Sequence, residues 1–160
     1  MARHEGGCLC GEVRFVADVD PMRVTVCHCR FCQRTTGSAY MVQPVFAKAD
    51  FHVTAGTPKT YDVISEGSGK RISIHFCGTC GARVMLGFER FPTGVGAFAG
   101  SFDEPGKLGL SSNVRHVFTG TAQDGTVLPA DVPLFHDHAI QLDGSLNEPK
   151  VLTEPARANR

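Results

Sequence analysis

The amino-acid sequence predicts a mostly β fold of small antiparallel sheets with little helix. Three observations predict it. Every window of ordinary helix length is interrupted by Gly, Pro or β-branched residues, segments that alternate apolar with polar or small residues recur, and turn-forming residues separate these segments. Such alternation buries one face of a strand, because successive side chains point to opposite faces of a sheet.

In chain order, the expected strands are 12–16, 23–26, 40–46, 51–54, 60–64, 71–76, 83–88, 94–98 and 114–119. The alternation is most regular in 12–16, 23–26, 71–76 and 83–88. Turns rich in Gly and Pro separate several of them, as in Ala55-Gly56-Thr57-Pro58. One short helical turn is expected over Arg30–Thr36, just before Gly37.

The length favours a single domain. The chain has 160 residues and 17.2 kDa, which is the size of one ordinary domain. We expect residues 1–143 to form that domain. Residues 144–160 are polar and interrupted by Pro, so we expect a C-terminal tail or a strap along the surface.

Charge and hydropathy disfavour two classes of partner. Lys plus Arg and Asp plus Glu both number 16, so the basic excess typical of proteins that bind nucleic acid or anionic membranes is missing. No apolar run reaches the length of about 18 residues expected of a membrane-spanning helix, and the N-terminus lacks a signal-peptide pattern. We therefore expect a cytoplasmic protein without nucleic-acid or membrane partners. The sequence does not specify an oligomeric state.

The seven cysteines form three groups, and this grouping is the strongest functional signal. They are Cys8-x-Cys10, Cys27-His28-Cys29-x-x-Cys32 and Cys77-x-x-Cys80. In a reducing cytosol such pairs indicate metal binding rather than disulfides, and an odd number would leave one cysteine unpaired. Zinc is favoured over an iron–sulfur cluster or a redox disulfide.

The third group predicts half of a tetrahedral site. Two thiolates separated by two residues, with Gly78 and Gly81 nearby, can reach one ion. Cys8 and Cys10 offer the other two ligands. Such a closed four-cysteine site is structural, because no position is left for substrate.

The remaining trio, Cys27, Cys29 and Cys32, could hold a second zinc ion with an open fourth position, which is typical of catalytic zinc. Alternatively, a histidine completes a second structural site. The candidates for that fourth ligand are His52, His75 and His116. Strand alternation directs His28 away from the metal. His136 and His138 form a His-x-His pair that is expected to lie in a solvated loop.

These motifs resemble the glutathione-dependent formaldehyde-activating enzyme family, also called the S-(hydroxymethyl)glutathione synthase or centromere-protein-V-like family. The number, order and spacing of the seven cysteines agree, and Arg34 and Gly37-Ser38 follow the trio. The segments 100–105 and 116–118 are similar to the family's later part. The resemblance covers roughly Gly6 to Val117.

The resemblance implies a β-tent fold and two zinc sites. It assigns Cys8, Cys10, Cys77 and Cys80 to structural zinc and Cys27, Cys29 and Cys32 to catalytic zinc. It also implies a carbon–sulfur lyase that reversibly joins glutathione and formaldehyde. Arginines are suited to bind the carboxylates of glutathione. The candidates are Arg30 and Arg34, with Arg71 and Arg83 as further possibilities.

Two departures from the family pattern concern the substrate region. Members often carry two arginines after the third trio cysteine, where this chain has Gln33-Arg34, and they often carry a Trp after the His-x-Phe segment, which this chain lacks.

Two other functions stay open. One is a zinc-stabilised binding module, or a thiol or aldehyde carrier, without turnover. The other is a methionine-sulfoxide-reductase-like enzyme, which would need a free nucleophilic cysteine that the metal-like grouping does not leave.

Overall fold

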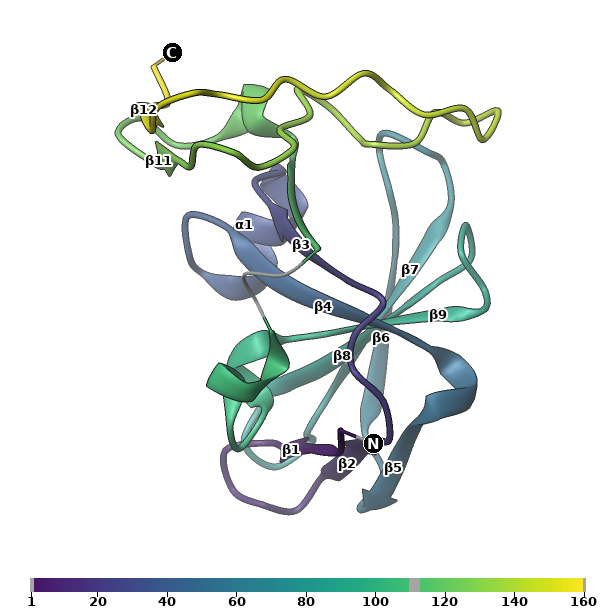
Figure 1. The fold of residues 1–160 in the computed structure, drawn as a ribbon. Coiled ribbons are helices and arrows are strands. Elements are labelled where there is room, and N and C mark those ends of the chain that lie inside the picture. Colours follow the sequence, from purple (N-terminus) through teal and green to yellow (C-terminus); the bar gives the residue numbers. More distant parts are fainter. Residues whose placement is uncertain (1, 110–112, 160) are drawn as a thin grey trace. The chain divides into compact units, whose positions relative to one another are not determined.

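A computed structural model describes residues 2–109 and 113–159 of the chain, and they form two compact units. Unit 1 contains residues 2–23 and 43–109, and unit 2 contains residues 24–42 and 113–159. Figure 1 labels helix α1 and most of the strands. Most of the elements are short strands, which confirms the mostly β prediction with its small sheets. The division into a domain of residues 1–143 and a tail stays a prediction.

Unit 1 consists of antiparallel strands in two groups. The first group is a three-stranded sheet of β1 (His4–Gly7), β2 (Arg14–Ala17) and β5 (Phe51–Ala55), in that spatial order. The second group contains, in spatial order, the end of β4 (Met41–Ala47), β9 (Gly94–Ala97), β8 (Arg83–Phe88), β7 (Arg71–Phe76) and β6 (Lys59–Ile64). The turn from β7 to β8 and the turn from β1 to β2 carry the cysteines of unit 1.

Unit 2 contains a parallel pair of strands, which differs from the expectation of antiparallel sheets. β10 (Val114–Val117) runs parallel to β3 (Arg23–Cys27), with Val117 opposite Cys27. A parallel arrangement needs a long connection, and the two strands are far apart in the sequence. Near the C-terminus, β12 (Ala156–Arg157) pairs with β11 (Val127–Leu128), so part of the 144–160 segment is hydrogen-bonded to the preceding chain.

Helical segments are few and short. The single α-helix among the described residues is α1 (Arg30–Thr36), as predicted, and it ends at Gly37 in the left-handed conformation with φ of 67°. The 3-10 helices were not predicted and are η1 (Lys48–Asp50), η2 (Ala99–Ser101), η3 (Pro105–Leu108) and η4 (Thr119–Thr121). None of the helices in the described part of the chain has the length and apolar character that crossing a bilayer requires.

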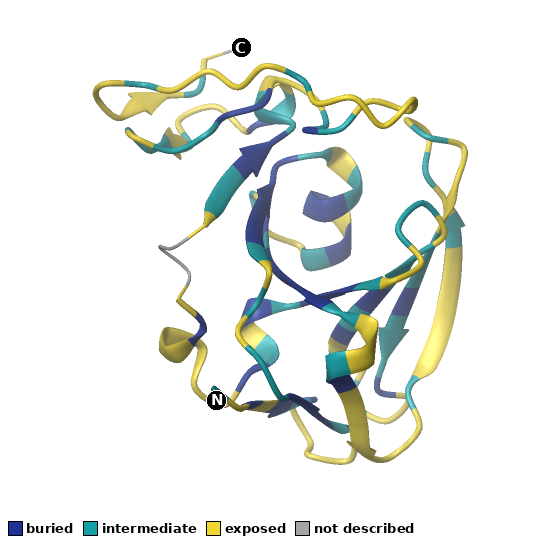
Figure 2. Cartoon of the chain, turned by 45° about the vertical axis from the view of Figure 1, so that its right-hand side comes forward, coloured by how far each residue is buried: buried dark blue, intermediate teal, exposed yellow. Residues whose placement is uncertain are grey.

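Phenylalanine rings form the aromatic core of unit 1, and the chain contains no Trp. The rings of Phe15 and Phe51 are stacked with centroids 4.9 Å apart, and Phe102 meets Phe15 edge-on at 5.0 Å. Phe46, which is fully buried, lies 5.8 Å from Phe51. Figure 2 shows the buried strands in dark blue, with exposed turns around them. Aromatic pairs in these geometries stabilise the sheets whose strands are connected by the cysteine turns.

Two differences from the predicted strands lie beside the first cysteine turn and have a structural reason. β1 was not predicted, since Gly6-Gly7 is typical of a loop. A Cβ at Gly6 would lie 2.5 Å from the ring of Phe15, so only glycine lets this strand approach β2. β2 begins at Arg14 rather than at residue 12, because the backbone of Val13 is bonded to Cys8 in the preceding turn.

Candidate metal centres

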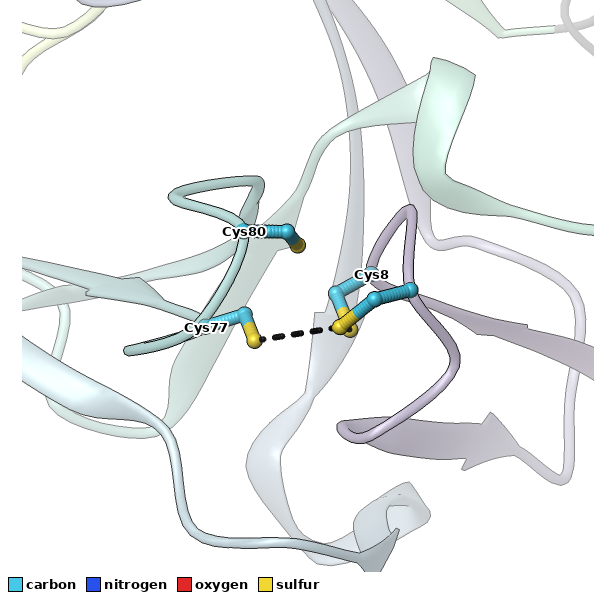
Figure 3. Close-up of side chains that lie close together, drawn as sticks. Cys8, Cys77 and Cys80 are labelled. Carbon is cyan, nitrogen blue, oxygen red and sulfur yellow. Dashed lines mark hydrogen bonds between the residues drawn. The ribbon is translucent and has the colours of Figure 1, made fainter.

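The first cysteine cluster joins two turns of unit 1. Cys8 and Cys10 lie between β1 and β2, and Cys77 and Cys80 lie between β7 and β8. The sulfurs of Cys8 and Cys10 are 3.5 Å apart, and those of Cys10 and Cys77 are 3.7 Å apart. All four sulfurs lie within 4.8 Å of one another. Figure 3 shows Cys77 and Cys80 on one turn facing Cys8 on the other.

Backbone hydrogen bonds close both turns. In the first, the amide of Val13 donates to the Cys8 sulfur at 3.2 Å, while the Cys8 amide donates to the Val13 carbonyl at 2.9 Å. In the second, the Cys77 amide donates to the Ala82 carbonyl at 2.9 Å, and Gly81 adopts a φ of 73°. Backbone hydrogen bonds from Ala82 and Cys10 lower the pKa of Cys80 to about 6. The amides directed at the Cys80 sulfur therefore favour its thiolate form.

The second cluster lies where β3 gives way to α1 in unit 2. Cys27 is the last residue of β3, Cys29 is the N-cap of α1, and Cys32 lies in its first turn. The sulfurs of Cys27 and Cys29 are 3.4 Å apart, and all three lie within 4.8 Å of one another. The Cys29 sulfur also accepts the Cys32 amide at 3.4 Å, so the cysteine takes the capping role that Ser or Asp usually fills.

The three thiols of the second cluster strongly perturb one another. Hydrogen bonds from the thiols of Cys27 and Cys32 lower the pKa of Cys29 to about 3. The hydrogen bond with Cys29 raises the pKa of Cys27 to about 12, and hydrogen bonds with both neighbours raise the pKa of Cys32 well above its usual value. The three thiols therefore titrate as one coupled group.

The donor atoms of both clusters fit a thiophilic metal ion. Zinc bound tetrahedrally to sulfur at about 2.3 Å has sulfur–sulfur edges of about 3.8 Å. The sulfur contacts given above, from 3.4 to 3.7 Å, are close to that edge. The first cluster offers four sulfurs and the second offers three, and within the described ranges neither group includes a His, Asp or Glu. Two clusters of this chain could therefore hold metal ions.

Histidines of unit 2 pack beside the second cluster instead of joining it. His28 is fully buried, and its Nε2 is 3.0 Å from Nδ1 of His116. The two rings are stacked with centroids 5.2 Å apart. Burial, and then the neighbouring His116, lower the pKa of His28 to about 4, and burial lowers the pKa of His116. Both imidazoles are thus neutral at physiological pH.

The other histidines named from the sequence make local contacts. His52 lies 3.9 Å from Asp18 and His75 lies 3.0 Å from Thr60, all in unit 1. In the His-x-His pair, His136 contacts Asp137 and is highly exposed, whereas His138 contacts the backbone of Ile140. These two side chains therefore have different partners.

A cavity of about 240 Å³ lies at α1 in unit 2. Its polar lining includes Arg30, Gln33, Arg34, Ser38 and Gln123. Two of the four arginines named from the sequence thus line one cavity, whereas Arg71 and Arg83 belong to strands of unit 1. The contributions of Gln33 and Gln123 were not predicted. Gln33 follows a candidate ligand directly, but only the folded chain shows which groups its amide reaches.

Comparison with known proteins places these clusters in context. A family model described as "Glutathione-dependent formaldehyde-activating enzyme" matches residues 3–121, a range that contains all seven cysteines. A curated protein of Halomonas elongata, provisionally named a glutathione-dependent formaldehyde-activating enzyme, is 31% identical over 102 residues. That match covers 62% of this chain and 65% of the Halomonas protein, so this chain spans less than two thirds of that relative's length.

One solved structure is similar in fold. A crystal structure of a Rhodobacter sphaeroides protein matches with a TM-score of 0.51 and 22% sequence identity. The match covers 66% of this chain and 94% of the other. At this identity the similarity concerns the fold alone.

Proposed function

The chain belongs to the glutathione-dependent formaldehyde-activating enzyme family, and from that premise we propose that it is a zinc-dependent carbon–sulfur lyase. The proposed reaction joins glutathione, or a similar thiol, to formaldehyde, or a similar aldehyde, and also runs in reverse. The observation that carries the proposal is the three-sulfur group of Cys27, Cys29 and Cys32, which has no fourth ligand among the described residues.

The two clusters have different proposed roles. Cys8, Cys10, Cys77 and Cys80 supply a complete tetrahedron, so we assign them to a structural zinc ion. Cys27, Cys29 and Cys32 supply three ligands, so we assign them to a catalytic zinc ion. When bound there, zinc would favour the deprotonated form of a thiol in the fourth position.

The proposed reaction forms one bond, between the sulfur of the thiol and the carbon of the aldehyde. The sulfur of the thiol substrate forms a bond to the aldehyde carbon, the carbonyl π electrons move to the aldehyde oxygen, and the thiol proton ends on that oxygen. The product is a hydroxymethyl thioether, and the reverse reaction releases the two reactants. The contribution of the chain is to bring the reactants together, which replaces a bimolecular encounter by reaction within one complex.

Arg30 and Arg34 are the proposed contacts for the glutathione carboxylates. Both line the cavity at α1, and each follows a trio cysteine within two residues. Guanidinium groups bind carboxylates through charge-assisted hydrogen bonds.

Because thiolate ligands require reduced cysteines, the proposal includes a cytosolic location.

The proposal is tested by NMR exchange spectroscopy of glutathione with formaldehyde. Wild-type protein is expected to speed the exchange between free glutathione and its hydroxymethyl adduct, whereas Cys29→Ser is expected to abolish that effect. Cys29 is not part of the four-sulfur group, so the variant should keep its fold.

The control is the uncatalysed reaction, because thiols also add to formaldehyde in solution. Exchange rates must therefore be compared with those of buffer and of denatured protein. If wild type and Cys29→Ser give identical spectra, the lyase proposal is wrong, and a zinc-stabilised binding module or carrier is the better description.

A further inference from the structure

We infer that the cavity at α1 is a subsite for an anionic group of the thiol substrate, and that buried Gln33 positions its key guanidinium. The inference rests on the proposed function for the identity of the ligand, which is a thiol that carries carboxylates. It adds a positioning residue, and it predicts which of the two cavity arginines binds the carboxylate more strongly.

The cavity carries unbalanced positive charge. Arg30 and Arg34 both line it, and its lining contains no Asp or Glu. Neither arginine forms an ion pair within the described residues. Ser38 and Gln123 add neutral hydrogen-bonding groups. A small cavity with two guanidinium groups and no acid is suited to a carboxylate.

Gln33 lines this cavity, and hydrogen bonds hold both ends of its side-chain amide. Its side chain is almost completely buried, and its amide nitrogen donates to the carbonyls of His28 at 2.5 Å and Thr121 at 2.9 Å. Those two carbonyls can only accept, so they determine which end of the amide is the nitrogen. The Gln33 oxygen therefore faces the cavity side, where it accepts from Arg30 and from Gln123, the latter at 3.2 Å.

This arrangement holds Arg30 without neutralising it. An amide oxygen orients one guanidinium N–H but carries no charge, so the remaining donors of Arg30 keep their affinity for an anion. Both arginines are exposed, but the Arg34 side chain has no hydrogen bond or ion pair within the described residues that would orient it. A side chain that is already oriented loses less conformational entropy on binding. Arg30 should therefore bind the carboxylate more strongly than Arg34.

The position of Gln33 also connects the cavity to the three-cysteine cluster. Gln33 follows Cys32 directly, and its nitrogen holds the carbonyl of His28, which lies between Cys27 and Cys29. Thr121 adds a second contact to the same carbonyl at 3.0 Å. The amide thus holds both the anion-binding side chain and the backbone that carries the sulfurs.

The test measures binding without chemistry. S-methylglutathione keeps both carboxylates but has no free thiol, and its diethyl ester lacks the carboxylate charges. Isothermal titration calorimetry with the zinc-loaded protein should show that the acid binds and that the ester binds at least tenfold more weakly. Arg30→Gln should weaken binding of the acid about 10- to 100-fold, the usual range for a hydrogen bond to a charged group. Arg34→Gln should weaken it less.

Gln33→Glu tests the positioning role. The new carboxylate would pair with Arg30 and neutralise it, and it could no longer donate to the carbonyls of His28 and Thr121, so affinity for the acid should fall much more than the weak affinity for the ester. Damage to the fold would instead lower both. Arg157→Gln removes the same charge from an exposed position of unit 2 outside the cavity, and it should bind like wild type.

The outcomes separate this inference from the lyase proposal. Equal binding of acid and ester, no binding at millimolar concentration, or an Arg30→Gln variant that binds like wild type would each overturn the subsite. Unchanged affinity for the acid in Gln33→Glu would overturn the positioning role. If the acid binds through Arg30 but the exchange experiment finds no catalysis, the subsite stands and the lyase proposal fails.

Discussion

Cys29 makes two contacts at the start of α1, one with a backbone amide and one with another cysteine. Its sulfur caps the first turn of α1 through the Cys32 amide and also lies 3.4 Å from the sulfur of Cys27. The spacing of the cysteines identified it as a ligand candidate from the sequence. Its low pKa could not be predicted in that way, because hydrogen bonds from two neighbouring thiols cause it. Composition gives residue types, whereas pKa values depend on contacts.

Gly56 allows a residue-scale prediction about the first cysteine cluster. It has a φ of 69°, and an added Cβ would lie 2.3 Å from the carbonyl oxygen of Glu12, beside the turn that carries Cys8 and Cys10. Gly56→Ala should destabilise the protein by about 1–3 kcal/mol, since backbone strain and a backbone clash combine. The measurement is the thermal midpoint at fixed zinc concentration.

Gly67→Ala is the matched control for that prediction. A Cβ at Gly67 meets nothing within 4 Å, and its backbone is not left-handed. The control should melt close to wild type. Equal midpoints for both variants would show that the close approach at Gly56 has no energetic consequence.

Among the elements, strands with regular alternation were the most predictable. β7 and β8 begin and end where the sequence predicts, and α1 has the predicted bounds. β1, β11 and β12 were missed. β1 contains two glycines, and β11 and β12 have two residues each, too few for a period to be recognised. Their pairing partners, rather than their own residues, determine that they are strands.

Helix α1 is too short to be stable by itself, so it depends on its ends. The amide of Gly37, in the left-handed conformation, donates to the Gln33 carbonyl at 2.8 Å. Gly37→Ala should lower stability by about 1 kcal/mol, because a Cβ is unfavourable there. Gly37→Asn should cost less, since Asn tolerates this conformation. Thermal midpoints of zinc-loaded variants test the order, and an Ala variant as stable as wild type would contradict it.

For the whole molecule, two bound zinc ions would change both the stability and the net charge. The chain has equal numbers of acidic and basic side chains. Two zinc ions held by seven thiolates would leave the loaded protein with a net charge of about minus three, which further disfavours binding to nucleic acid. Structural zinc supplies about 10–16 kcal/mol of apparent binding free energy, which is comparable with the total stability of a domain.

Removal of the structural zinc should therefore unfold much of the protein. Wild type is expected to contain two zinc ions per chain, and Cys77→Ser is expected to be insoluble or unfolded, because Cys77 is completely buried in the cluster. Zinc content by mass spectrometry and circular dichroism are the measurements. Leu9→Ser is the control in the same turn, since Leu9 is highly exposed between two ligands. A folded Cys77→Ser protein without zinc would contradict the structural assignment.

The sequence by itself determined the family and the class of fold. Spacing selected the seven sulfurs as candidate metal ligands, and period-two alternation selected strands, because both signals lie within a few neighbouring residues. Only the tertiary structure decided that β10 runs parallel to β3 and that Gln33 connects Arg30 with the backbone beside the sulfurs. These features depend on contacts between residues far apart in the chain, and such contacts form only when the sheets pack.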